Sequence, residues 1–235
     1  MSAYDSGMIP WPPDSAETPL AALVSGGLDS AVLLAESLRV YPAVTPITIR
    51  TGAVWEAAEL EHLRQFLAAI RTRALRPLVE LDLPVRDLYG DHWSLTGHGV
   101  PDARSADDAV YLPGRNVILF AKALLWCHLH GVPELATAPL ASNPFPDATD
   151  AFYNGMAEVV NLAVRGTVSV LRPYAAMGLT KADVLKRGIG LPLQLTFSCI
   201  APVAGRHCGC CNKCAERRLG FADAGMHDPT EYAHD

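Results

Sequence analysis

Five of the six cysteines in this chain fall within residues 199–214, near its end. Four of them follow one spacing, in which two C-x2-C steps share a cysteine: Cys199, Cys208, Cys211 and Cys214. Thiolates on a tight, glycine-containing loop can converge on one point, and a tetrahedron of sulfur ligands suits Zn²⁺. A four-thiolate iron–sulfur cluster fits the same spacing. Cys210 or His207 could replace Cys211 as a ligand, although the regular spacing favours Cys211.

A second group of residues, near the start of the chain, has the side chains and glycines needed to hold phosphate. The stretch SGGLDS (25–30) follows a short apolar run and precedes a helical pattern. Two glycines let the backbone turn tightly, and the N–H groups of a helix start then face an anion. Asp29 would repel a phosphate alone, so it either caps the helix or helps to hold a metal ion on the phosphates. The alternative is a strand-to-helix turn in which the glycines serve geometry only.

The elements that must position these two groups alternate between strand and helix patterns. Short apolar runs predict strands at 20–25, 43–50, 76–83, 133–140 and 168–173. Helical periodicity predicts helices at 29–40, 55–75, 115–131, 148–165 and 179–188, the last with Thr180 as N-cap and Asp183 three residues later. This alternation predicts an α/β fold with a doubly wound, mostly parallel five-stranded sheet. Ligands of such sheets bind at the carboxyl ends of the strands.

Length and charge narrow the possible functions. The chain has 235 residues and a net charge of −6, which disfavours direct nucleic-acid binding, because that needs a Lys/Arg surface. No apolar run approaches the roughly 20 residues of a transmembrane helix. The start carries acidic residues and prolines and is unlike a signal peptide. We therefore expect a cytoplasmic protein without membrane contact, in which structural disulfides are rare.

The two groups, with the stretches between them, resemble the 7-cyano-7-deazaguanine synthase family of the N-type (PP-loop) ATP pyrophosphatases. The resemblance runs from about residue 20 to about residue 222. After SGGLDS (25–30), called the phosphate loop below, the resemblance continues through SLT (94–96), YLPGRN (111–116), VNLA (160–163), TKAD (180–183) and LTFSC (195–199). Arg217 and Phe221 follow the last cysteine at the spacing of the family. The ordered series, rather than any single motif, carries the resemblance.

The resemblance implies an ATP-dependent ligase of queuosine biosynthesis. Such an enzyme adenylates 7-carboxy-7-deazaguanine, converts the adenylate to an amide with ammonia, and dehydrates the amide to 7-cyano-7-deazaguanine. It also implies ATP, Mg²⁺ and Zn²⁺ as cofactors, and a homodimer. The residues that would hold the pyrophosphate are Val24, Ser25, Gly26, Gly27, Leu28, Asp29 and Ser30.

Three residues are the catalytic candidates under this resemblance: Asp29, Arg115 and Lys181. The two cations would face the triphosphate or the carboxylate of the substrate. Their alternatives are a solvated lysine in a first helical turn and an arginine paired to a surface acid, while Asn116 could be a helix cap. The chain then divides into an irregular arm (1–18), an ATP pyrophosphatase α/β domain (19–190) and a zinc-binding segment (191–235).

Two stretches depart from the family pattern, both where the acceptor should bind. Gly52–Trp55 read GAVW where the family reads close to Gly-Gln-Arg-His, so polar groups are replaced by apolar ones. Residues 145–149 read FPDAT, with Ala148 and Thr149 at the positions of a cysteine and an arginine. An arginine can pair bidentately with a carboxylate, so its loss weakens such recognition.

Three other functions therefore stand beside the leading one. The first is an amide ligase that joins a different acid or amine, including a protein terminus. The second is a nucleotide-binding module without catalysis. The third is a sulfur-inserting tRNA enzyme on the same scaffold, which the acidic net charge disfavours.

Overall fold

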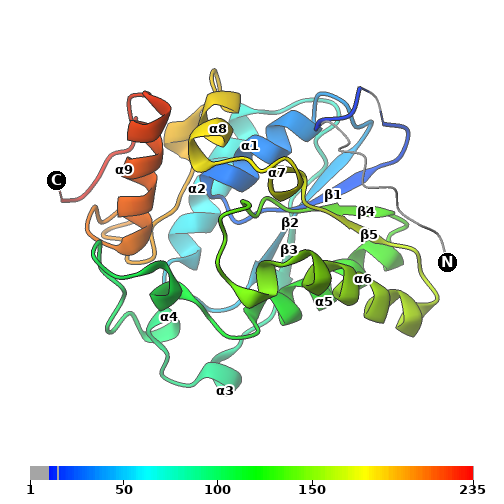
Figure 1. The fold of residues 1–235 in the computed structure, drawn as a ribbon, viewed down its shortest axis with the longest axis horizontal. Coiled ribbons are helices and arrows are strands. Elements are labelled where there is room, and N and C mark those ends of the chain that lie inside the picture. The colour runs from blue at the N-terminus through cyan, green and yellow to red at the C-terminus, as the bar shows by residue number, and fades with distance from the viewer. Residues whose placement is uncertain (1–10, 15, 235) are drawn as a thin grey trace.

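The structure is a computed structural model that describes residues 11–14 and 16–234. Five parallel strands form one sheet in the order β3–β2–β1–β4–β5 (Figure 1). The strands are β1 (Leu20–Leu23), β2 (Val44–Arg50), β3 (Val79–Asp82), β4 (Glu134–Ala136) and β5 (Ser169–Leu171). All five predicted strands are confirmed, and the strand order reverses at β1, where ligands of open α/β sheets bind.

Helices cover both faces of the sheet, as the doubly wound prediction requires (Figure 1). The helices are α1 (Leu28–Ser37), α2 (Glu56–Ala69), α3 (Arg86–Tyr89), α4 (Trp93–Thr96), α5 (Arg115–Leu129), α6 (Asp150–Val164), α7 (Pro173–Ala176), α8 (Lys181–Arg187) and α9 (Asn212–Ala224). Three 3₁₀ turns are η1 (Asp107–Val110), η2 (Pro146–Ala148) and η3 (Leu193–Leu195). No helix of the described residues combines the length and apolarity needed to cross a bilayer.

The central strand divides the core into two layers. Successive strand side chains point to opposite faces. Leu20 and Ala22 accordingly pack with α1, α2 and α8, whereas Ala21 packs with α5 and α6. A strand that is apolar on both faces explains why the run at residues 20–25 shows no alternation.

Two sequence predictions need correction. The helix predicted at 55–75 ends at Ala69, because Leu75 forms a parallel bridge with Val44 and the chain must leave the helix to reach that position. The zinc-binding segment also contains α9, a helix that the sequence analysis did not predict. Of the expected arm at 1–18, residues 1–10 and 15 lie outside the described part, and Trp11 packs into the core. The three-part division of the chain stays a prediction.

Candidate functional site

The loop between β1 and α1 is organised by its own serines and glycines. Gly26 has a φ of +86°, and a Cβ there would lie 3.1 Å from the main-chain oxygen of Glu59, so both conformation and contact favour glycine. The Ser25 hydroxyl accepts from the N–H of Gly27 at 3.2 Å. The Ser30 hydroxyl donates to the carbonyl of Gly27 at 3.1 Å. These contacts fix the shape of the loop, with the start of α1 behind it.

The ends of this loop are fixed from the core. Val24 donates its N–H to the carbonyl of Ile47 at 2.8 Å, and Leu28 is buried. Gly27 caps α1 without a side-chain cap, so the capping role considered for Asp29 is wrong. Oδ1 of Asp29 is buried and has no hydrogen-bond partner within the described residues.

Asp29 instead pairs with Lys181 from α8. Nζ of Lys181 lies 2.6 Å from Oδ2 of Asp29 and 3.1 Å from Oε1 of Glu216 on α9. Burial acts to lower the pKa of Lys181, but the two carboxylates outweigh it and raise that pKa. Burial acts to raise the pKa of Glu216, but Lys181 and Lys213 outweigh it and hold that pKa at about 2. The alternative of a solvated Lys181 is therefore wrong, and the three side chains form one charged cluster.

Local sequence explains the position of Lys181. Thr180 caps α8 by accepting from the N–H of Asp183, and the Asp183 carboxylate accepts from the N–H of Thr180. The predicted capping box is confirmed. It makes Lys181 the first residue of the helix, directly beside the phosphate loop.

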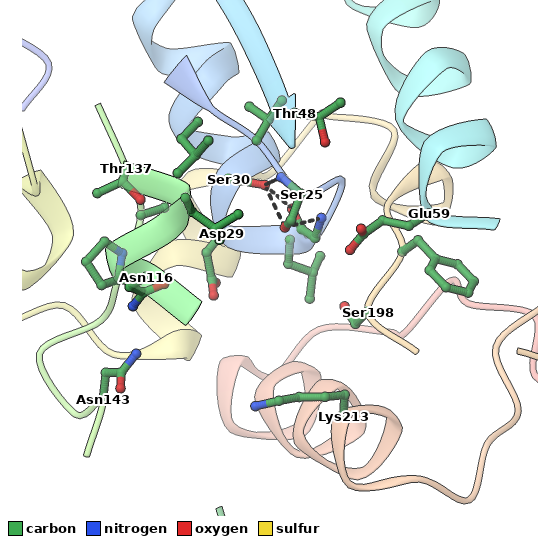
Figure 2. A pocket seen from close by; sticks show the side chains of 18 of the residues that line it. Ser25, Asp29, Ser30, Thr48, Glu59, Asn116, Thr137, Asn143, Ser198 and Lys213 are labelled. Carbon is green, nitrogen blue, oxygen red and sulfur yellow. Dashed lines mark hydrogen bonds between the residues drawn. The ribbon is translucent and has the colours of Figure 1, made fainter. Parts of the chain in front are cut away.

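A cavity of about 370 Å³ opens at the carboxyl ends of β1, β2 and β4. The phosphate loop forms one wall, and Thr48 and Thr137 project from strand ends beside it (Figure 2). Arg115 lines the cavity from the start of α5 and makes no ion pair within the described part of the chain, so the surface-pair alternative is wrong. Asn116 does not cap α5, because Gly114 does, and its amide donates to the carbonyl of Asp147 at 2.9 Å. The structure thus brings Arg115, Lys181 and the phosphate loop together around one space.

Four polar residues that no sequence pattern indicated also line this cavity: Glu59, Ser198, Lys213 and Glu216. Figure 2 shows the Glu59 carboxyl group directed at the loop, with Ser198 beside it and Lys213 below. The position of Glu216, two residues after the last cysteine of the motif, was the one available signal.

The four cysteines predicted as metal ligands meet at one buried point. Their Sγ atoms all lie within 4.8 Å of one another. Sγ of Cys199 and Cys211 are 3.9 Å apart, as are Sγ of Cys208 and Cys214. Tetrahedral Zn–S bonds of about 2.3 Å place sulfur atoms about 3.8 Å apart. The cluster therefore fits one zinc ion, whereas an iron–sulfur cluster needs space for several iron and sulfide ions between its thiolates.

The surroundings of the sulfur atoms also fit a bound cation. N–H groups of Ala201 and Cys208 point at Sγ of Cys199 at 3.3 and 3.2 Å, which stabilises a thiolate. Cys210 is exposed and lies outside the cluster. His207 is buried, and its Nε2 accepts from the N–H of Ser198 at 3.1 Å, so neither alternative ligand joins the four sulfurs.

A buried arginine connects the cysteine segment (residues 199–224, which include α9) to the phosphate loop. Arg217 on α9 donates to the hydroxyl of Thr196 and to the carbonyl of Leu193, both at 2.9 Å. The segment it holds then donates the N–H of Phe197 to the carbonyl of Gly26 at 2.8 Å. A short chain of contacts thus links the cysteine cluster to the phosphate loop.

Of the two departing stretches, the first reaches this cavity through Trp55 and the second reaches an adjoining hollow through Phe145. Trp55 is buried, lines the cavity and stacks with Trp93 at 5.7 Å between ring centroids. Phe145 stacks on Tyr111 at 5.0 Å. The hydroxyl of Thr149 caps α6 and is engaged with the backbone. Trp55 thus places an aromatic ring where the family pattern has a histidine, and Thr149 places a capping hydroxyl where that pattern has an arginine.

Comparison with known proteins gives one family. A family model described as queuosine biosynthesis protein QueC matches residues 20–225. A 7-cyano-7-deazaguanine synthase of Xanthomonas campestris pv. campestris (strain B100) is 35% identical over 224 residues, covering 90% of this chain and 96% of that protein. The enzyme of the same name from Xanthomonas oryzae pv. oryzae (strain PXO99A) is also 35% identical, with the same coverage.

Among solved structures, a 4-thiouridine synthetase–RNA complex with bound ATP matches with a TM-score of 0.47 and 16% identity. The match covers 88% of this chain and 51% of that one. This structural similarity is too low to indicate a family. The sequence matches indicate it.

Proposed function

This chain belongs to the queuosine biosynthesis protein QueC family, and from that premise we propose that it converts 7-carboxy-7-deazaguanine to 7-cyano-7-deazaguanine with ATP and ammonia. One observation supports the ATP-dependent step above the others. The phosphate loop, Lys181 and Arg115 surround a single cavity at the carboxyl ends of the strands. A loop at the start of a helix, with half-buried cations beside it, suits a triphosphate.

In the proposed first step, a carboxylate oxygen of the acid attacks the α-phosphorus of ATP, and pyrophosphate leaves. The N–H groups of the phosphate loop and the hydroxyls of Ser25 and Ser30 would hold the leaving pyrophosphate. Lys181 is held beside Asp29 and Glu216, so its charge is fixed in place before the negative charge develops. Such prior positioning is the main way in which enzymes stabilise charge in phosphoryl and adenylyl transfer.

In the second step, ammonia attacks the acyl carbon and AMP leaves, which gives the amide. A second ATP then activates the amide oxygen, and loss of AMP with that oxygen leaves the nitrile. No covalent intermediate with the protein is needed. Mg²⁺ would be held by Asp29, whose buried Oδ1 lacks a partner within the described residues, and would neutralise charge on the phosphates.

Zinc takes a structural part in this proposal. Cys199, Cys208, Cys211 and Cys214 would form a closed four-thiolate site, which leaves no position for substrate. The ion would hold the start of α9, and α9 carries Glu216 and Arg217 to the cavity.

A second candidate is an amide ligase for another acid or amine. The aromatic pair of Trp55 and Trp93 and the engaged hydroxyl of Thr149 favour it, because neither offers a charge to the carboxylate of the acceptor.

The test is a direct assay of the purified chain with ATP, ammonium and 7-carboxy-7-deazaguanine, followed by mass spectrometry. We expect both the amide and the nitrile, with release of AMP and pyrophosphate. ATP-dependent release of pyrophosphate with another acid, and none with this one, would replace the leading proposal by the second candidate. No pyrophosphate release with any acid, while ATP still binds, would indicate a non-catalytic module.

A further inference from the structure

Glu59 is a carboxyl group in the cavity that the steps above do not use. It lies in the first turn of α2, and its Cγ would be 3.4 Å from a Cβ placed on Gly26. Figure 2 shows its carboxyl group pointing from α2 toward the phosphate loop, into the space also faced by Ser198. Neither a hydrogen bond nor an ion pair engages this carboxyl group within residues 11–14 and 16–234. It is therefore free to act on a ligand.

The surroundings of Glu59 raise the pKa of its carboxyl group toward neutral pH. Burial raises the pKa of Glu59 to about 8, while the charge of Arg115 on α5 opposes the shift and Glu56 on α2 adds to it. The other charged side chains that line the cavity are Asp29 of α1, Lys181 of α8, and Lys213, Glu216 and Arg217 of α9. A carboxyl group with this pKa exchanges its proton near neutral pH, and its ionised form can accept a proton from a ligand.

The other carboxylates that line the cavity pair with a cation. Asp29 and Glu216 both pair with Lys181. Asp147 accepts from the N–H of Asn116 and is not part of the cavity wall. Nε2 of His62 lies 3.3 Å from the carbonyl of Gly205. Among the described residues, Glu59 is therefore the carboxyl group of the cavity wall that has no cation partner, and no histidine belongs to that wall.

We propose that Glu59 is the general base of the amide-forming step, a role that rests on the proposed function. Ammonia attacks the acyl carbon, the new N–C bond forms, and the nitrogen carries a positive charge. Glu59 takes one proton from that nitrogen as the C–O bond to AMP breaks and AMP leaves with the electron pair. The products are the amide, AMP and a protonated Glu59, which returns its proton to solvent.

The test separates adenylation from amide formation in Glu59→Gln, an isosteric change that cannot accept a proton. Adenylation is followed by exchange of labelled pyrophosphate into ATP in the presence of the acid, and amide formation by mass spectrometry. We expect exchange within about threefold of the wild type and amide formation reduced about 100-fold or more. Glu61→Gln, on the exposed face of the same helix, is the matched control and should change neither rate.

The pH dependence of amide formation is a second measurement, and it would not change if Glu59 had only a structural role. Total ammonium is adjusted between about pH 6 and pH 9.5 so that free ammonia stays constant. Amide formation by the wild type should then rise with pH and level off above about pH 8, and the profile of Glu59→Gln should be flat. Glu59→Asp, which keeps the acid one methylene further back, should retain the slope at a reduced rate.

Three results would overturn the inference. Equal losses of exchange and amide formation in Glu59→Gln would assign Glu59 to nucleotide binding. An increased Mg²⁺ requirement for exchange would make it a metal ligand. An unchanged pH profile would exclude it as the base. Failure of the proposed function appears separately, as a wild type that makes no amide; exchange and hydroxamate formation from hydroxylamine then test Glu59 with whichever acid supports exchange.

Discussion

Nζ of Lys181 lies 2.6 Å from Oδ2 of Asp29, although 152 positions separate the two residues in the chain. The contact joins the first turn of α8 to the first turn of α1, directly beside the phosphate loop. Glu216 reaches the same ammonium group from α9. One lysine of α8 therefore connects the start of α1, beside the phosphate loop, to α9 of the cysteine segment.

The first prediction removes that charge. In Lys181→Met, release of pyrophosphate should fall by about 10²- to 10³-fold, because a fixed cation beside the developing phosphate charge is lost. Lys186→Met, on the exposed side of the same helix, is the control and should keep the wild-type rate. Steady-state pyrophosphate release measures both. Equal rates for the wild type and Lys181→Met would remove Lys181 from the proposed mechanism.

The second prediction concerns Gly220, which packs against the side chain of Lys181. Gly220 lies on α9, and a Cβ there would approach Cγ of Lys181 to 2.5 Å, too close for the side chain to keep its position. Gly220→Ala should therefore lower activity by about tenfold through a displaced ammonium group, with a cost in stability of roughly 1–3 kcal/mol.

Gly155 provides the matched control for this substitution. It lies inside α6, and a Cβ there meets no atom within 4 Å. Gly155→Ala should raise the free energy of unfolding by about 0.5–1 kcal/mol and leave activity unchanged. Equal activity in both alanine variants would show that the position of Lys181 does not depend on Gly220.

Sequence patterns predicted the sheet and the phosphate loop because their signals are local. The apolar run before Gly26 and the capping box at Thr180 each specify their own segment. Glu59 and Glu216 were missed for the opposite reason. Each is one acid on a polar helix, and only the tertiary packing turns it toward the cavity. The pairing of Lys181 with Asp29 is likewise a contact across the fold.

Helix α9 was missed because its sequence has a weak apolar pattern. NKCAERRLGFADA places charged or amide side chains at six of its thirteen positions and has glycine in its interior. Its buried residues are Asn212, Cys214, Arg217, Gly220 and Phe221, of which Phe221 is the one large apolar side chain. Periodicity does not reveal a helix that is held by a cysteine cluster and by hydrogen bonds of a buried arginine.

The third prediction concerns the cysteine cluster. The purified chain should contain about one zinc ion per chain, and Cys211→Ser should lose it. Loss of roughly 4 kcal/mol of metal-dependent stability would lower Tm by about 10 °C. Cys210→Ser is the control, because Cys210 is exposed and outside the cluster. Metal analysis and thermal unfolding with and without a chelator measure both effects. A Cys211→Ser protein with full zinc content would contradict the ligand assignment.

The fourth prediction uses the raised pKa of Glu59. The pKa of this carboxyl rises from 4.5 to about 8 on folding, so between these values the folded protein binds a proton that the unfolded chain has released. Its contribution to stability is therefore present at low pH and is lost as pH rises through about 8. Glu59→Gln has no proton to lose.

The two proteins should therefore diverge with pH in a defined direction. Relative to the wild type, Glu59→Gln should gain roughly 3 kcal/mol in free energy of unfolding between about pH 5.5 and pH 8.5. Other titrating groups are shared, so the difference between the two proteins isolates Glu59. Urea unfolding at the two pH values measures it, and Glu61→Gln should follow the wild type. A constant difference across this range would show that Glu59 titrates at its ordinary pKa, and that the cavity does not raise it.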